Sequence, residues 1–118
     1  MNTSIDTRII EEQLGLPDKI EEADLFADYD MVAVFDRYLP LADYLLDQYA
    51  CPNDGVRMVV EETMYTALMM AISKFRRAGL YKKEDSFACF LVQILSEFMD
   101  EFAKEGKVYK IDHLQVMQ

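Results

Sequence analysis

Apolar residues recur every three to four positions along most of the chain. In the segment 31–49 they are Met31, Val34, Phe35, Tyr38, Leu41, Ala42, Leu45 and Tyr49. This spacing is typical of a helix with one inward face, whereas a half-buried strand alternates at every second residue. We therefore predict a helix over 31–49. Pro40 lies inside it and removes one backbone hydrogen bond, so we expect either a kink or two abutting helices.

The longest predicted helix covers residues 56–78. Gly79 follows it, and glycine readily takes the left-handed conformation that ends many helices. Within 58–72 the charged residues are Glu61 and Glu62, and the rest of that segment is apolar on almost every face. A helix that is apolar all round is either central in the fold or part of an interface, and we consider both positions for this helix.

A further long helix is predicted near the C-terminus. Ser86 can cap its first turn and Gly106 can end it. Cys89 has Phe87 and Phe90 as neighbours, which predicts a buried thiol. The tail shows only a weak strand-like patch at 108–111, which we leave without a firm assignment.

Two short helices are expected in the N-terminal region. Thr3 or Ser4 can cap the first, which ends at Gly15, and Pro17 suits the first turn of the second. Together the elements predict an all-α fold, a single-domain bundle of four to five helices with a short irregular or strand-like C-terminal tail. The two C-terminal helices form its apolar centre.

Charge divides this predicted single helical domain (1–118) into two halves. Residues 1–54 contain 13 acidic and 3 basic residues, whereas residues 55–118 contain 9 of each, so the net charge of −10 arises in the first half. The chain thus has an acidic N-terminal half and an apolar, charge-balanced C-terminal half. An acidic field repels nucleic-acid phosphates and favours encounters with basic partners.

The sequence predicts a soluble, cytoplasmic protein. It contains no uninterrupted run of roughly 18 apolar residues, the length that a membrane-spanning helix requires. Its first residues lack the basic start and apolar block of a secretory signal. Cys51 and Cys89 are far apart and do not form a CxxC motif, so a disulfide framework is not expected.

Residues suited to catalysis are sparse. The single histidine, His113, lies near the chain end, and the sequence offers no partners to orient it as a triad would. Glu97 and Asp100 form an ExxD pair, which is half of the carboxylate set that a magnesium-dependent all-α nucleotide pyrophosphohydrolase requires; Glu61 and Glu62 are adjacent, not three apart. We therefore expect no catalytic residue, no metal site, no cofactor and no enzyme activity, and keep the pyrophosphohydrolase as a remote alternative.

Aspartates and tyrosines of the acidic half suit binding to a protein. On a helix Asp36, Asp43 and Asp47 fall within about 40° of one another. The predicted partner-binding residues are Asp28, Asp30, Asp36, Asp43, Tyr44 and Asp47. The favoured hypothesis is a non-catalytic protein that docks this face on a basic partner, such as a nuclease or DNA-binding protein, as an inhibitor, immunity protein or nucleic-acid mimic. The alternative for the face itself is a solvated surface that only keeps the chain soluble.

The methionine-rich helix supports a second hypothesis, a homo-oligomeric assembly or adaptor subunit. Its predicted interface residues are Met58, Tyr65, Met69 and Ile72. A small bundle does not cover both sides of a helix this apolar, and a homodimer would cover the remainder. Simple core filling by the methionines is the competing interpretation. A basic patch around Gly79 would pair internally or dock a second subunit; it consists of Lys74, Arg76, Arg77, Lys82 and Lys83. We expect neither a membrane nor direct nucleic acid as partner.

Overall fold

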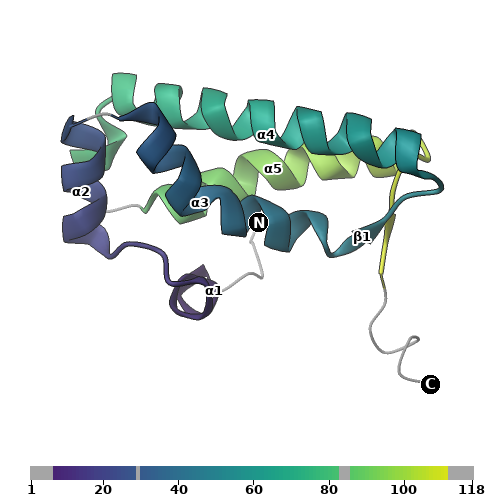
Figure 1. Cartoon of the computed structure of the whole chain (residues 1–118), viewed down its shortest axis with the longest axis horizontal. Coiled ribbons are helices and arrows are strands. Elements are labelled where there is room, and N and C mark those ends of the chain that lie inside the picture. The colour runs from purple at the N-terminus through teal and green to yellow at the C-terminus, as the bar shows by residue number, and fades with distance from the viewer. Residues whose placement is uncertain (1–6, 29, 83–85, 112–118) are drawn as a thin grey trace.

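The computed structural model describes residues 7–28, 30–82 and 86–111, and these form an all-α bundle (Figure 1). The elements are α1 (Thr7–Leu14), α2 (Lys19–Asp28), α3 (Met31–Leu46), β1 (Tyr49–Ala50), α4 (Asp54–Arg77), the 3₁₀ turn η1 (Leu80–Lys82), α5 (Phe87–Lys104) and β2 (Tyr109–Lys110). Helices α3, α4 and α5 pack on one another, while α1 contacts α3 and α5 and α2 lies at one end. The predicted fold class is confirmed.

The core is centred on aromatic rings from four helices. Phe87 of α5 lies 5.2 Å from Phe26 of α2, 4.7 Å from Tyr38 of α3 and 5.1 Å from Phe75 of α4, measured between ring centroids. All four side chains are buried. Tilted and edge-on aromatic pairs contribute about 1 kcal/mol beyond the burial of their area. This cluster therefore fixes the acidic α2 on the apolar C-terminal helices.

Polar side chains cap the N-termini of α4 and α5. Ser86 Oγ accepts a hydrogen bond from Cys89 N (3.1 Å), and Asn53 Oδ1 accepts one from Val56 N (2.9 Å). Gly79 and Gly106 have φ angles of 70° and 76°, the left-handed conformation expected of helix ends. The ends of α4 and α5 thus follow from local chemistry.

The two N-terminal helices are present, with a correction to the start of the second. Pro17 precedes α2 and does not lie in its first turn, because the helix begins at Lys19 and Asp18 Oδ1 accepts a hydrogen bond from Glu21 N (2.8 Å). The proposed caps Thr3 and Ser4 lie outside the described residues. Cys89 is exposed rather than buried, and its Sγ lies 2.9 Å from Thr7 Oγ1 of α1.

Helix α3 differs from its prediction at two places. It runs through Pro40 as one helix, so the expectation of two abutting helices is wrong. Pro40 is exposed, and water can reach the backbone carbonyl that loses its partner. The helix ends at Leu46 because the chain turns at 47–48 and then enters an antiparallel ribbon, in which Tyr49 pairs with Lys110. The strand-like tail patch is thereby confirmed over Tyr109–Lys110.

None of the helices in the described ranges is both long and apolar enough to cross a lipid bilayer.

Candidate interaction surfaces

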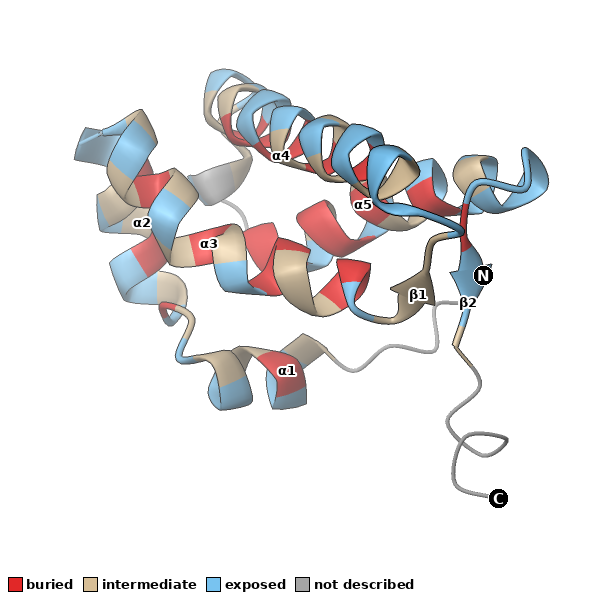
Figure 2. Ribbon diagram, turned by 45° about the vertical axis from the view of Figure 1, so that its right-hand side comes forward, coloured by how far each residue is buried: buried red, intermediate tan, exposed pale blue. Residues whose placement is uncertain are grey.

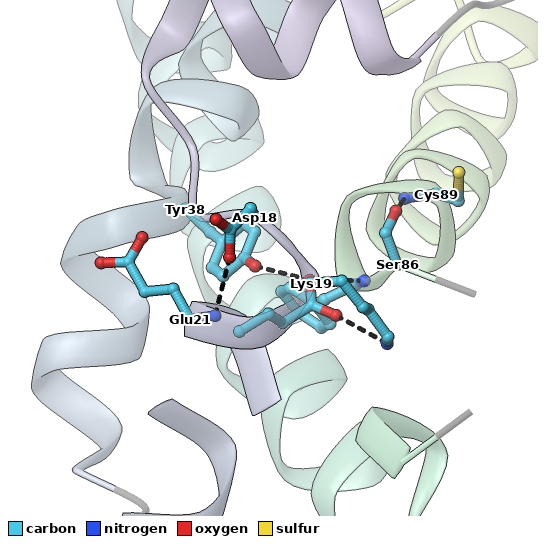
Figure 3. A network of polar contacts seen from close by, with 8 residues as sticks. Asp18, Lys19, Glu21, Tyr38, Ser86 and Cys89 are labelled. Carbon is cyan, nitrogen blue, oxygen red and sulfur yellow. Dashed lines mark hydrogen bonds and ion pairs between the residues drawn. The ribbon is translucent and has the colours of Figure 1, made fainter. Parts of the chain in front are cut away.

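A network of polar contacts joins α2, α3 and α5 (Figure 3). Glu22 of α2 is only 1% exposed. Its Oε2 accepts hydrogen bonds from Tyr38 Oη (2.7 Å) and from Phe87 N (2.9 Å), and its Oε1 lies 3.1 Å from Lys19 Nζ. The carboxylate therefore sits at the N-terminus of α5, where backbone N–H groups and the helix dipole favour negative charge.

The sequence analysis missed this role of Glu22. No local pattern connects it with Phe87, 65 positions away. Burial and the adjacent Glu22 carboxylate raise the pKa of Tyr38 far above its ordinary value, so the phenol remains a neutral donor. Because the carboxylate is bonded to three helices and closed to solvent, we assign the network to stability and not to ligand binding.

The aspartates predicted to form an acidic face divide into two groups. Asp30 is the N-cap of α3 and accepts from the backbone N–H groups of its first turn. Asp43 Oδ1 accepts a hydrogen bond from Tyr65 Oη (2.8 Å), and Asp47 Oδ1 lies 3.3 Å from Arg57 Nη2. These three carboxylates already have partners inside the chain, which reduces the charge available to a basic protein.

Asp28 and Asp36 form the second group. Both are exposed, and neither makes an ion pair with another described residue.

Tyr44, the predicted aromatic member of the face, is half-buried and lines a cavity of about 310 Å³ beside Tyr49 and Asp100. Burial, and then the Asp100 charge, raise the pKa of Tyr49. The predicted acidic face is thus smaller than its sequence suggests.

The outer side of α4 is exposed along much of its length (Figure 2), and large apolar side chains are among its exposed residues. Met58 is 63% exposed and Met70 is 66% exposed, and Met69 and Val59 are also exposed. Ile72 is fully buried, which corrects its assignment to an oligomer interface: it is three residues past Met69 and so lies about 60° further round the helix, among core residues.

Tyr65 connects the two surfaces that the sequence analysis kept apart. Its hydroxyl donates to Asp43, and its ring lies edge-on to Phe35 with centroids 6.5 Å apart. Burial and the bond to Asp43 raise the pKa of Tyr65 to about 12. Its half-buried ring leaves only part of the side chain for contact with a second protein.

A groove runs between α4 and α5 beside these exposed residues. One cavity of about 330 Å³ is lined by Ala67, Met70, Ala71, Ser73, Lys74, Arg77, Ile94 and Phe98. A second, of about 320 Å³, is lined by Glu62, Thr63, Thr66, Ala67, Met70 and Phe98. Because the two share Ala67, Met70 and Phe98, we treat them as one surface, the α4–α5 groove. The interface residues predicted from the sequence include neither Met70 nor Phe98.

Opposite charges flank the ends of this groove. Glu62 lines it near the start of α4, and Lys74 and Arg77 line it near the end. Within the described ranges none of the three forms an ion pair. Arg76, from the same predicted basic patch, is differently placed, because its Nε donates to the Phe26 carbonyl (3.0 Å).

The carboxylates required by the enzyme alternative do not assemble in the described part of the chain. Glu97 and Asp100 are exposed on α5, whereas Glu61 accepts a hydrogen bond from Arg57. Among the described residues, no three His, Cys, Asp or Glu side chains gather closely enough to bind a metal ion. His113 lies outside those residues.

Comparisons of the chain with models of protein families, with curated proteins and with solved structures find no match.

Proposed function

We propose that this chain is a non-catalytic protein-binding protein, an assembly or adaptor subunit that docks through the α4–α5 groove. The observation that supports the proposal is the continuous apolar surface formed by Met70 and Phe98 over the floor residues Ala67 and Ala71. Removing apolar surface from water contributes about 25 cal/mol for each Å², and contiguous exposed patches of this kind mark interaction sites.

The shape and chemistry of the groove suit a helix of another protein. Small Ala67 and Ala71 side chains in the groove between α4 and α5 leave room for the side chains of an incoming helix. Flexible Met70 can adjust to the contour of that partner, and Ser73 and Thr66 provide polar groups at the edge.

A charge inside the groove tests this proposal. Met70→Asp should reduce capture of the binding partner from native cell extract about tenfold or more, because docking would bury an unpaired carboxylate. The fold should persist, since Met70 is mostly exposed. Gln93→Asp, on an exposed position of α5 that does not line the groove, is the matched control. Equal capture by wild type and both variants, measured by quantitative mass spectrometry after crosslinking, would show that the groove is not the docking surface.

A second candidate function uses the acidic half. Exposed Asp28 and Asp36, together with the net charge of −10, favour docking on a basic nuclease or DNA-binding protein as an inhibitor, immunity protein or nucleic-acid mimic. The same capture experiment separates the candidates. Loss of a basic partner in Asp36→Lys, with Met70→Asp unaffected, would favour this second function over the first.

A further inference from the structure

We infer that the occupant of the α4–α5 groove is a second copy of this chain, with the two α4 helices antiparallel. This inference rests on the proposed function, since it names the partner of the same surface. In the resulting two-fold dimer each surface would contact its own equivalent, so the surface must be complementary to itself. The order of residues along α4 meets that requirement.

Charge supplies the first part of the self-complementarity. Glu62 and Arg77 are separated by about four helical turns, or about 22 Å, on the side of α4 that lines the groove. Antiparallel pairing brings Glu62 of each copy towards Arg77 of the other, which forms the same ion pair twice. Parallel pairing would place like charges together at both ends, so the charges select the antiparallel arrangement.

Apolar and polar contacts agree with the same arrangement. If Glu62 aligns with Arg77 of the second copy, the two-fold axis passes between Met69 and Met70. These exposed methionines then meet at the centre of the interface. Thr66 faces Ser73 of the second copy, one turn from the centre on either side. An apolar centre, small polar side chains and charges at the rim are the usual anatomy of a protein interface.

The local charge of the groove also favours a second copy over a basic protein. Lys74 and Arg77 outnumber Glu62 there, although the whole chain has a net charge of −10. A basic partner would meet these two cations, whereas an antiparallel second copy presents its acidic end to them. The acidic surfaces of α2 and α3 do not line the groove in either copy.

Charge reversal and restoration test the proposed dimer. The molar mass of the full chain, measured by sedimentation equilibrium from about 1 to 200 μM, should rise from monomer to dimer. Glu62→Arg or Arg77→Glu alone should weaken dimerisation about tenfold or more, because like charges then face each other. The double variant Glu62→Arg/Arg77→Glu should restore it by reversing both pairs. Asp24→Arg, an equal charge change at an exposed position outside the groove, is the control and should leave dimerisation unchanged.

Three results would overturn the inference. A monomeric wild type at every concentration excludes the second copy; if Met70→Asp still abolishes capture of another protein, the docking function of the groove survives. If the wild type dimerises but neither Glu62→Arg nor Arg77→Glu weakens the dimer, the dimer interface lies outside the α4–α5 groove. Single variants that weaken the dimer without restoration in the double variant exclude the antiparallel alignment. Thermal unfolding of each variant, followed by circular dichroism, verifies that it is folded.

Discussion

At the scale of single residues, Glu22 has the most demanding environment among the described side chains. An unpaired carboxylate would destabilise the core, but two hydrogen bonds and the Lys19 ammonium compensate its burial. Exposed ion pairs such as Arg37–Glu21 differ, because water screens them even though the guanidinium lowers the pKa of Glu21. A carboxylate's contribution therefore depends on burial and on the number of donors around it.

The variant Glu22→Gln should lower the free energy of unfolding by about 2 kcal/mol or more. An amide has one accepting oxygen, which can keep the bonds from Tyr38 Oη and Phe87 N; its NH₂ group then faces Lys19 Nζ, also a donor, and the negative charge at the N-terminus of α5 is lost. Asp24→Asn makes the same chemical change at an exposed position of α2 and should stay within about 0.5 kcal/mol of wild type. Urea unfolding followed by circular dichroism measures both. Equal stability of the two variants would mean that the buried negative charge and its pairing with Lys19 add nothing.

At the scale of elements, the sequence predicted the helices best where a cap or a glycine determines their ends. Ser86 and Gly79 act on adjacent backbone, so local chemistry suffices. The end of α3 at Leu46 could not be predicted in this way, because β1 pairs with residues about 60 positions later. Tertiary pairing overrides helical periodicity there.

The α4–α5 groove was also predictable only in part, because it depends on how separate helices pack. Periodicity identified α4 as too apolar for one buried face, and Met58 and Met69 are indeed exposed. It could not determine which stripe faces the core, and Ile72 was therefore placed on the wrong side. The groove also needs Phe98 of α5, and the packing of two helices creates that contact.

Pro40 gives a prediction at the element scale. Pro40→Ala should raise the free energy of unfolding by about 1 kcal/mol, because alanine restores a backbone N–H inside α3 and no packed side chain is lost at this exposed position. The larger conformational entropy of the unfolded alanine chain offsets part of that gain. Thermal unfolding by calorimetry measures the difference. A lower midpoint than wild type would show that α3 depends on the proline geometry, and Asp36→Ala, one turn earlier, controls for surface changes.

At the scale of the whole molecule, charge is unevenly distributed over one packed core. The acidic α2 is fixed on the apolar helices by Phe26, which contacts Phe75 and Phe87. The electrostatic repulsion between α2 and the other acidic segments therefore persists in the folded state. Net charge far from zero destabilises a compact state through this self-repulsion.

Salt should consequently stabilise the fold. Raising sodium chloride from about 0.02 to 0.3 M shortens the Debye length from roughly 20 Å to about 6 Å, which screens long-range repulsion more than close ion pairs. We expect the midpoint of thermal unfolding at pH 7 to rise by a few degrees, measured at a concentration where the chain is monomeric. Asp24→Lys/Asp28→Lys removes acidic charge at exposed positions and should reduce the rise. A midpoint that falls with salt would mean that ion pairs outweigh repulsion.

The bond between Glu22 and Phe87 also sets an order of events during synthesis. Glu22 leaves the ribosome 65 residues before its backbone partner, so α2 exists in the nascent chain before the donor that fixes it. Until α5 emerges, the carboxylate stays hydrated and α2 lacks the ring of Phe87 against which Phe26 packs. Helices α3 and α4 can pack earlier, since few residues separate them. Helix α2, although synthesised early, is therefore among the last elements to reach its final packing.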